Sequence, residues 1–234
     1  MNSIKDYRNK ELVSYISVNA LVLLVILNIL DLKETLLSSE NISKIINSFL
    51  ITSCLSVFAY LGDSILSGDI KDKLVDLWRG RPGGKIFTKI KDNNKDIRFT
   101  NEQVLERYTE VYSNLPTTSK ERYKYENSKW YSIYHRYEKV EKIYNANRDY
   151  LLCRDMHIAT YVITVLYIVI GLLSSAVNVT WQCVLCEIVF LLITNVAARQ
   201  KAKRLAYNVI AYDLQQKELP QNYFFDKENK KDVE

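Results

Sequence analysis

Long apolar blocks alternate with strongly polar stretches along the chain. Four apolar blocks lie at about residues 12–32, 45–66, 158–177 and 181–197. A helix of about 20 residues matches the thickness of the hydrocarbon core of a bilayer. The first block lacks the short apolar region and the small-residue cleavage site of a signal peptide, so we expect it to be retained as a span. The pattern predicts an all-α integral membrane protein with four transmembrane helices.

The polar region between the second and third blocks contains a periodic stripe. No proline or glycine interrupts the chain from Ser119 until Gly171. Within this run, apolar positions recur at alternating spacings of three and four, as one face of a helix requires. The pattern predicts one continuous helix from Ser119 to Ala176, which links the polar region to the third span. The stripe comprises Trp130, Ile133, Tyr137, Val140, Tyr144, Asn147, Leu151, Arg154 and Ile158, and it is apolar except at Asn147 and Arg154.

Shorter elements are predicted in the same polar region. Residues 70–78 have the spacing of an amphipathic helix with Ile70, Leu74 and Leu77 on one side. Thr100 and Gln103 have the spacing of a capping box, which predicts a helix from there to about residue 114. Residues 85–99 contain two short apolar clusters around a polar turn, and they predict one or two short strands. The scarcity of glycine and proline, six and three in the chain, favours helices overall.

Basic residues mark one side of the predicted membrane. The positive-inside rule places the N-terminus, the large loop and the C-terminal tail in the cytoplasm, and the two short connections outside. The bases nearest the spans on the inner side are Lys5, Arg8, Lys10, Lys71, Lys73, Arg79, Arg81, Arg148, Arg154, Arg199, Lys201, Lys203 and Arg204. We therefore expect a cytosolic N-terminus at 1–11, a transmembrane hairpin at 12–66, a cytosolic loop subdomain at 67–157, a second transmembrane hairpin at 158–198, and a cytosolic helix with a disordered tail at 199–234.

Composition gives no indication of nucleic-acid binding. The net charge of +5 is modest for a chain of 234 residues. Tyrosine, tryptophan and basic residues interleave between residues 123 and 137, which is a pattern that can stack bases. At helical spacing, however, an aromatic stripe is more typical of a packed core. We expect no direct binding of nucleic acid.

No group of residues matches a catalytic pattern. The two histidines, His135 and His157, do not have an arginine at the spacing that an Arg–His nuclease motif requires. Cys183 and Cys186 form a Cys-x-x-Cys pair, but no further Cys pair or His accompanies it, so neither zinc binding nor redox chemistry is indicated. We expect a protein that is not an enzyme and that needs no cofactor.

Polar residues inside the apolar blocks are candidate functional residues. Glu187 is the only ionisable residue well inside a block, and Asn19 and Asn28 lie in the first block. Carboxylates inside a membrane are costly and usually face a bundle interior or water. Glu187 lies about two turns from the outer end of its span, so access to water there is the alternative explanation.

A basic, glycine-rich turn follows the second block. The segment 79–85 has the sequence Arg-Gly-Arg-Pro-Gly-Gly-Lys. Backbone N–H groups of such a turn can hold a phosphate, and the segment has none of the known phosphate-binding fingerprints. Arg79, Arg81 and Lys85 are candidates for contact with a lipid headgroup or a nucleotide. The alternative is a tight turn whose arginines face lipid phosphates at the membrane surface.

Three clusters in this chain resemble a family of small, mostly uncharacterised bacterial inner-membrane proteins. They are Trp78-Arg79 with Pro82-Gly83 and Phe87; Asn127 with Trp130-Tyr131 and Tyr134; and residues 147–152, Asn-Arg-Asp-Tyr-Leu-Leu, with Arg154-Asp155. The likeness covers about residues 45–176. Small multi-span proteins of this kind are often membrane effectors of anti-phage defence systems, and the resemblance implies that association.

The third cluster places charged residues just before the third span. Arg148 and Asp155 are a full heptad apart on one helix, so we expect the pair Arg148–Asp149 and the pair Arg154–Asp155 to find partners on other elements. The expected partners are Arg199 or Lys203, for Asp149 or Asp155, on the helix after the fourth span. With Asn147, these five residues form a candidate switch, and a structural clamp is the alternative.

The combined pattern suggests a membrane effector in the bacterial inner membrane. We expect it to perturb the membrane, as a pore or by depolarisation, when its cytosolic subdomain is triggered. Expected partners are the lipid bilayer, further copies of the chain, and a cytosolic protein or a nucleotide signal. The alternatives are a membrane anchor that binds a soluble partner through the cytosolic loop, and a small transporter or channel subunit.

Overall fold

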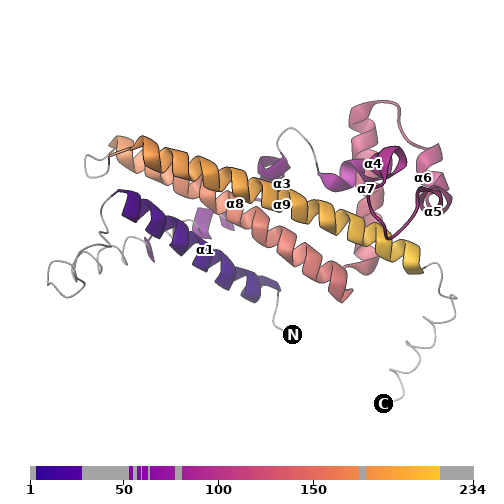
Figure 1. Cartoon of the computed structure of the whole chain (residues 1–234), viewed down its shortest axis with the longest axis horizontal. Helices are drawn as coiled ribbons and strands as arrows, with labels where there is room; N and C mark the ends of the chain where they lie inside the picture. The colour runs from indigo at the N-terminus through magenta and orange to yellow at the C-terminus, as the bar shows by residue number, and fades with distance from the viewer. Residues whose placement is uncertain are drawn as a thin grey trace, which may run out of the picture. The chain divides into compact units, whose positions relative to one another are not determined.

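All regular structure in the described part of the chain is helical, which confirms the all-α prediction (Figure 1). The computed structural model describes residues 4–27, 53–54, 57–58, 60–62, 64–76, 81–173 and 178–216. Asn28 and most of the predicted second span lie outside these residues. The helices are α1 (Ile4–Ile26), α3 (Gly68–Asp76), η1 (Pro82–Lys85), α4 (Ile86–Asn93), α5 (Asn101–Arg107), α6 (Thr109–Ser113), α7 (Ser119–Tyr137), α8 (Glu141–Leu173) and α9 (Trp181–Gln216).

The chain forms two compact units. The first, here called the bundle unit, comprises residues 1–79 and 148–201, and the second, called the helical unit, comprises residues 80–147 and 202–234. The long helices α8 and α9 contribute residues to both units. The helical unit therefore contains the last part of α9 as well as most of the loop between the second and third predicted spans.

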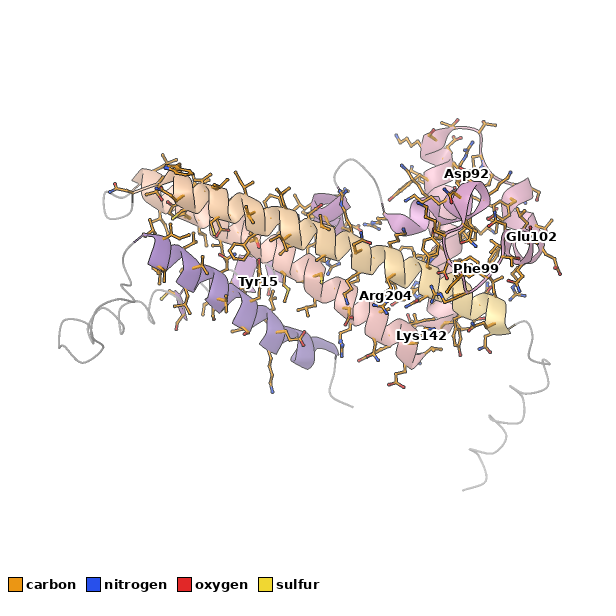
Figure 2. All side chains as sticks on the ribbon, viewed as in Figure 1. Tyr15, Asp92, Phe99, Glu102, Lys142 and Arg204 are labelled. Atoms are coloured by element: carbon orange, nitrogen blue, oxygen red, sulfur yellow. The ribbon has the colours of Figure 1, made fainter. Side chains whose placement is uncertain are left out.

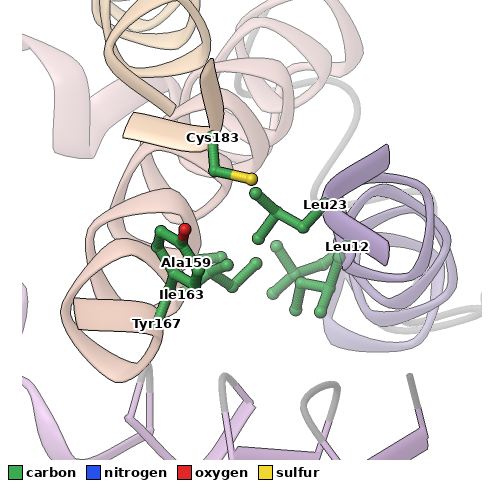
Figure 3. Packing of buried hydrophobic residues seen from close by; sticks show 7 residues of the cluster. Leu12, Leu23, Ala159, Ile163, Tyr167 and Cys183 are labelled. Atoms are coloured by element: carbon green, nitrogen blue, oxygen red, sulfur yellow. The ribbon is translucent and has the colours of Figure 1, made fainter. Parts of the chain in front are cut away.

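In the bundle unit, α8 and α9 run antiparallel with α1 beside them (Figure 1). Paired side chains show the antiparallel order: Thr164 bonds to Glu187, and His157 to Thr194. The core between the three helices is apolar and holds seven buried residues (Figure 3). These are Leu12, Ile16 and Leu23 of α1, Ala159, Ile163 and Tyr167 of α8, and Cys183 of α9. Cys183 therefore serves as a small apolar core residue.

Two of the described helices, α8 and α9, are long and apolar enough to cross a membrane. Only 33% and 22% of their most apolar stretches are buried inside the molecule, and the rest of these stretches is exposed. A core helix of a water-soluble protein would bury most of its apolar side chains. The large exposed residues of α8 and α9 are Val165, Val169, Ile170, Leu172, Leu173, Trp181, Leu185, Ile188, Val189, Leu192, Ile193 and Val196.

The first predicted span corresponds to α1, which begins before the apolar block and continues into it. Residues 53–54, 57–58, 60–62 and 64–65 of the second predicted span are helical. A Cβ added at Gly62 would lie 3.0 Å from both methyl groups of Val162, so this glycine allows a close approach to α8. Small residues commonly permit such contacts between helices in membranes.

The helical unit is built around aromatic side chains. The ring of Phe87 makes edge contacts with Tyr108 and Tyr112, at centroid distances of 5.2 and 6.2 Å. The Trp130 indole N–H donates to the Ala206 carbonyl at 3.2 Å, so α7 is held on the last part of α9. The other buried apolar residues of this core include Ile86, Ile90, Val104, Val111, Ile133, Ile143, Leu205, Val209 and Ile210.

The capping box predicted at Thr100 is confirmed. Gln103 N–H donates to the Thr100 hydroxyl, and the Thr100 N–H donates to the Gln103 side chain at 2.8 Å. The helix that follows is divided at Tyr108 into α5 and α6. Val104, Tyr108 and Val111 are all buried, so the predicted face of this helix is the one that packs.

The prediction of one continuous helix from Ser119 to Ala176 is wrong. The chain leaves the helix at Glu138 and starts α8 at Glu141, and Val140 N–H donates to the Tyr137 carbonyl across the turn. Trp130 and Tyr137 both bond to residues of α9, which fixes α7 on that helix. Because these tertiary contacts override local helix propensity, the turn forms without glycine or proline.

The strands predicted between residues 85 and 99 are also wrong. Ile86 to Asn93 forms the helix α4, whose apolar side chains Ile86, Phe87 and Ile90 are buried on one face. Asn94 to Thr100 forms turns, which the Asn94 side chain supports by donating to the Phe99 carbonyl at 2.8 Å. The two apolar clusters are thus one helical face and one turn.

Candidate functional site

Buried charges connect α3 to α8 near the start of the third predicted span. We call Lys71, Asp72, Tyr150, Arg154 and Asp155 the α3 charge cluster. Arg154 bridges two carboxylates, with Nη1 at 3.0 Å from Asp72 Oδ1 and Nε at 3.1 Å from Asp155 Oδ1. Lys71 Nζ lies 3.6 Å from Asp155 Oδ1, and the Tyr150 hydroxyl donates to Asp72 Oδ1 at 3.0 Å.

Little water reaches these groups. The side chain of Arg154 is 11% exposed, as is that of Asp72, and that of Asp155 is fully buried. Burial alone would lower the pKa of Arg154, but Asp155 and Asp72 reverse this and raise its pKa above the ordinary value. Removing one partner from such a set leaves a buried charge uncompensated, which typically costs about 3–5 kcal/mol.

The end of α3 is held by α9. Asn195 Nδ2 donates to the Val75 carbonyl at 3.0 Å, and Arg199 donates to the same oxygen from Nε and Nη2 at 3.1 Å each. Amide and guanidinium donors satisfy carbonyls that a helix leaves unpaired at its C-terminal end. Buried His157 lies within hydrogen-bonding distance of both Thr194 and Asn195, which links α8 to the same region.

The contacts of the candidate switch residues differ in part from expectation. Asp149 does pair with the part of α9 that follows the predicted fourth span, but with Lys201 at 2.8 Å and with neither Arg199 nor Lys203. Asp155 pairs with Lys71 of α3 and with neighbouring Arg154, while Arg199 is engaged by the Val75 carbonyl. These pairings arise because α3 occupies the surface between α8 and α9.

The structure brings four of the five candidate switch residues into one unit. Arg148 lies 3.0 Å from Asp149, and Arg154 and Asp155 belong to the α3 charge cluster. Asn147 is half-buried and belongs to the helical unit.

The sequence interpretation missed Lys71 and Asp72. It assigned the packing face of this helix to Ile70, Leu74 and Leu77, but Lys71, Asp72 and Val75 are buried and Ile70 is 45% exposed. Leu77 lies outside the described residues. Apolar spacing pointed to the wrong face because the partner surface is charged. The charges of Lys71 and Asp72 are explained only by their partners Asp155 and Arg154 on α8, which the sequence does not place beside them.

A second group of polar residues lies inside the bundle unit. We call Tyr15, Asn19, Thr160, Thr164 and Glu187 the intramembrane polar cluster. The Tyr15 hydroxyl lies 2.7 Å from Thr160 Oγ1, and Thr164 Oγ1 lies 3.1 Å from Glu187 Oε2. Tyr15 projects from α1 toward the neighbouring helices (Figure 2). The structure thus brings together Asn19 and Glu187, two residues that the sequence identified separately.

The basic turn at 79–85 has a packing role. Arg81 N–H donates to the Tyr123 hydroxyl at 2.7 Å, and Gly84 N–H donates to the Arg81 carbonyl at 3.0 Å. A Cβ added at Gly83 would lie 2.8 Å from the Trp130 ring, and one at Gly84 would overlap the Tyr123 ring. These two glycines are therefore needed for the approach of the turn to α7. Lys85 is exposed, and Arg79 lies outside the described residues.

Two buried acids stabilise the helical unit. The Glu126 carboxylate accepts from Thr88 N–H at 3.2 Å and from the Thr88 hydroxyl, so α7 caps the N-terminus of α4. Burial raises the pKa of Glu126, because it outweighs the hydrogen bonds from Thr88, which alone would lower the pKa.

Asp213 accepts from the hydroxyls of Tyr108 and Tyr137 at 2.7 and 2.8 Å and from Arg107 Nε at 3.2 Å. Burial would raise the pKa of Asp213, but these hydrogen bonds outweigh burial and lower it. In return, burial together with Asp213 raises the pKa of Tyr137 to about 12.

No cluster of three or more His, Cys, Asp or Glu that could hold a metal ion occurs among the described residues. The chain was also compared with known proteins. No protein-family model, no curated protein and no solved structure matches it.

Proposed function

We propose that the chain is a four-span protein of the bacterial inner membrane that perturbs the ion barrier of the bilayer when its cytosolic unit is triggered. The observation that carries the proposal is the contrast within the bundle unit. The outer surfaces of α8 and α9 expose large apolar residues, while Asn19 and Glu187 are fully buried between the helices. An apolar exterior suits lipid, and polar groups inside a lipid-facing bundle commonly mark an ion or proton path.

The proposal of four spans rests on the sequence around α1 and residues 45–66, since only α8 and α9 among the described helices are long and apolar enough to cross a membrane. Both segments carry an apolar block of about 20 residues, enough to cross a hydrocarbon core of about 30 Å. The first and second spans then form a hairpin, as do the third and fourth. With the basic residues on the inner side, this gives cytoplasmic N- and C-termini.

The α3 charge cluster is the proposed point of control. It fixes α3 to α8 through Arg154, and the Val75 carbonyl receives donors from α9. Buried ion pairs of this kind have one favourable arrangement, and breaking a pair is costly. A signal that displaces α3 would therefore alter the packing of the two spans together. The trigger is a cytosolic protein or a nucleotide signal that acts on the helical unit.

On the resemblance described above, we propose that this activity serves anti-phage defence. A defence effector perturbs the membrane only after infection, which requires a controlled resting state. The exposed apolar surface also suits association with further copies of the chain in the bilayer, so we propose a homo-oligomer as the active form.

The test is to express the full chain in a bacterium, apply its trigger or overexpress it, and follow membrane potential with a voltage-sensitive dye. The expected result is depolarisation and arrested growth. Arg154→Ala combined with Asp155→Ala should insert normally but abolish depolarisation. The matched control is Arg98→Ala combined with Asp96→Ala, which removes an Arg–Asp pair of the helical unit at 2.5 Å. Unchanged potential and growth on expression of the wild-type chain would contradict the proposal.

One observation favours the second candidate, a membrane anchor. Tyr131, Tyr134 and His135 form a ring cluster on α7, with centroids 5.5–6.1 Å apart, and the His135 side chain is 65% exposed. Aromatic groups at a surface are common anchors in protein interfaces. A pull-down with the full chain in detergent distinguishes the two candidates. An anchor should retain a soluble partner, and the double variant Tyr131→Ala with His135→Ala should release it. Expression of an anchor should also leave the membrane potential unchanged. The loop alone is unsuitable, because the helical unit also needs the end of α9.

A further inference from the structure

The intramembrane polar cluster has more acceptors than its hydrogens can satisfy. Thr164 Oγ1 lies 2.8 Å from the Thr160 carbonyl and 3.1 Å from Glu187 Oε2. A hydroxyl carries one hydrogen, so it satisfies one of these two oxygens and presents a lone pair to the other. Glu187 Oε1 has no hydrogen-bond partner at all, and neither has Asn19 Oδ1.

Asn19 does not resolve this imbalance. Its side chain is fully buried and lies close enough to Glu187 and Tyr15 to act on both, but neither its oxygen nor its nitrogen makes a hydrogen bond. A hydrogen bond from the Asn19 amide to the Glu187 carboxylate would not change the charge of the site. The carboxylate would then be hydrogen-bonded, but its negative charge would remain without a positive partner.

No basic side chain of the described residues acts on Glu187. The groups that do act on it are Thr164 and Asn19, both uncharged. An isolated buried carboxylate is very costly, and proteins compensate such charges by pairing them, by binding a cation or by protonating the carboxylate. The geometry therefore leaves Glu187 in need of one positive charge, either a proton or a bound cation.

We propose that Glu187, Asn19 and Thr164, with Tyr15 beside them, form a binding site for a monovalent alkali cation. The available ligands are all oxygens, from a carboxylate, an amide and hydroxyl groups, which are the donors that hard cations prefer. A single acidic residue balances one positive charge, whereas a divalent ion would normally recruit further carboxylates. The ligands come from α1, α8 and α9, so a bound ion would hold the three helices of the bundle unit together.

The inference rests on the membrane location in the proposed function, and it does not depend on the effector activity. The experiment measures the thermal unfolding of the purified full chain in lipid nanodiscs, against increasing NaCl or KCl. N-methylglucamine chloride replaces the salt to keep the ionic strength constant. We expect an alkali-dependent rise in Tm that saturates, and that Glu187→Gln abolishes. Glu126→Gln is the matched control, because it alters an equally buried glutamate of the helical unit and should keep the full alkali response.

Two further variants keep the test decisive if Glu187→Gln does not fold. Thr164→Val and Asn19→Leu retain the carboxylate but each remove one ligand oxygen, and each should raise the half-saturating alkali concentration at least tenfold. An equal response to alkali and N-methylglucamine salts in the wild-type chain would overturn the proposal. A stabilisation that appears only on acidification and is lost in Glu187→Gln would also overturn the proposal. In that case the Glu187 carboxyl group binds a proton and not an alkali cation. An alkali response of Tm without depolarisation in cells would support the cation site and contradict the proposed function.

Discussion

One buried carboxylate of the bundle unit, Glu187, is partnered less completely than the buried carboxylates of the helical unit. In the helical unit, Asp213 receives hydrogen bonds from two tyrosines and an arginine, and Glu126 receives them from Thr88. In the bundle unit, Glu187 Oε2 shares the Thr164 hydroxyl with the Thr160 carbonyl, and Glu187 Oε1 has no hydrogen-bond partner. Fully partnered acids of the first kind fix a fold, and a partly satisfied buried acid is typical of a functional site.

The two units also differ in the polarity of their exposed side chains. The bundle unit exposes rows of valine, leucine and isoleucine on α8 and α9, whereas the α4–α7 region of the helical unit exposes mainly charged and polar side chains. A buried aromatic core with a polar exterior is organised for water. An apolar exterior with a polar interior is organised for lipid.

The largest expected effect is in the helical unit. Asp213→Ala leaves Arg107, Tyr108 and Tyr137 without their shared acceptor, and should cost about 3–5 kcal/mol of unfolding free energy. Hydrogen exchange of the full chain in detergent should show loss of protection in α5 and α7. Asp92→Ala removes an exposed aspartate and should change protection by less than about 0.5 kcal/mol. Equal effects of the two variants would remove the distinction between partnered and surface acids.

A charge on the surface of each unit tests the contrast between lipid and water. Leu192 is 62% exposed on α9. Leu192→Arg should raise the free energy of membrane insertion by about 3 kcal/mol if this residue lies at the centre of a span. Leu105, which is 39% exposed on α5, should tolerate the same change at almost no cost. The measurement is the fraction of each variant recovered in the membrane after alkaline extraction. If Leu192→Arg inserts as well as Leu105→Arg, the exposed face of α9 does not contact lipid.

Glycine substitutions compare the packing of the two units. A methyl group at Gly83 would lie 2.8 Å from the Trp130 ring, so Gly83→Ala should cost about 1–3 kcal/mol through overpacking. At Gly68, on α3, the nearest atom would be Arg154 Nη1 at 4.0 Å, so Gly68→Ala should be neutral or slightly stabilising. Chemical denaturation in detergent measures both. A neutral Gly83→Ala would show that the turn does not pack on α7 as described.

The smallest expected effect is the acid dependence of the Asp149–Lys201 pair. Burial would raise the pKa of Asp149, but Lys201 and Arg148 outweigh it and lower the pKa. A lowered carboxyl pKa adds stability above the unfolded value near pH 4, and this stability is lost as the pH falls through the folded value. Both side chains are about one-third exposed, so the gain should be about 0.5–1 kcal/mol. Asp149→Asn should remove this part of the acid dependence of Tm, and an unchanged profile would show that the pair contributes nothing.

Much of the architecture follows from local sequence patterns. The capping box at Thr100 depends on two residues three positions apart, so the sequence alone predicts the start of α5. The apolar blocks likewise predict α8 and α9, because a span requires an uninterrupted run of apolar residues. The turn at Glu138–Val140 could not be predicted in this way, since it is set by contacts of Trp130 and Tyr137 with a helix about 75 residues later.

The candidate sites show the same division. Asn19 and Glu187 stand out in the sequence because polar residues are rare in apolar blocks, and the structure places them in one cluster. Lys71 and Asp72 do not stand out, because charged residues are common on amphipathic helices and are usually exposed. Their burial depends on Arg154 and Asp155, which are about 80 residues away in the chain. The role of Glu126 as the cap of α4 was hidden for the same reason.

The most direct test of the account asks which unit lies in lipid and which in water. Single cysteines replace Leu105 and Leu192 in a chain whose four native cysteines are changed to alanine, and inverted inner-membrane vesicles are treated with a membrane-impermeant maleimide. We expect rapid labelling at position 105, and no labelling at position 192 until the membrane is dissolved in denaturant. Equal labelling at both positions in intact vesicles would contradict it.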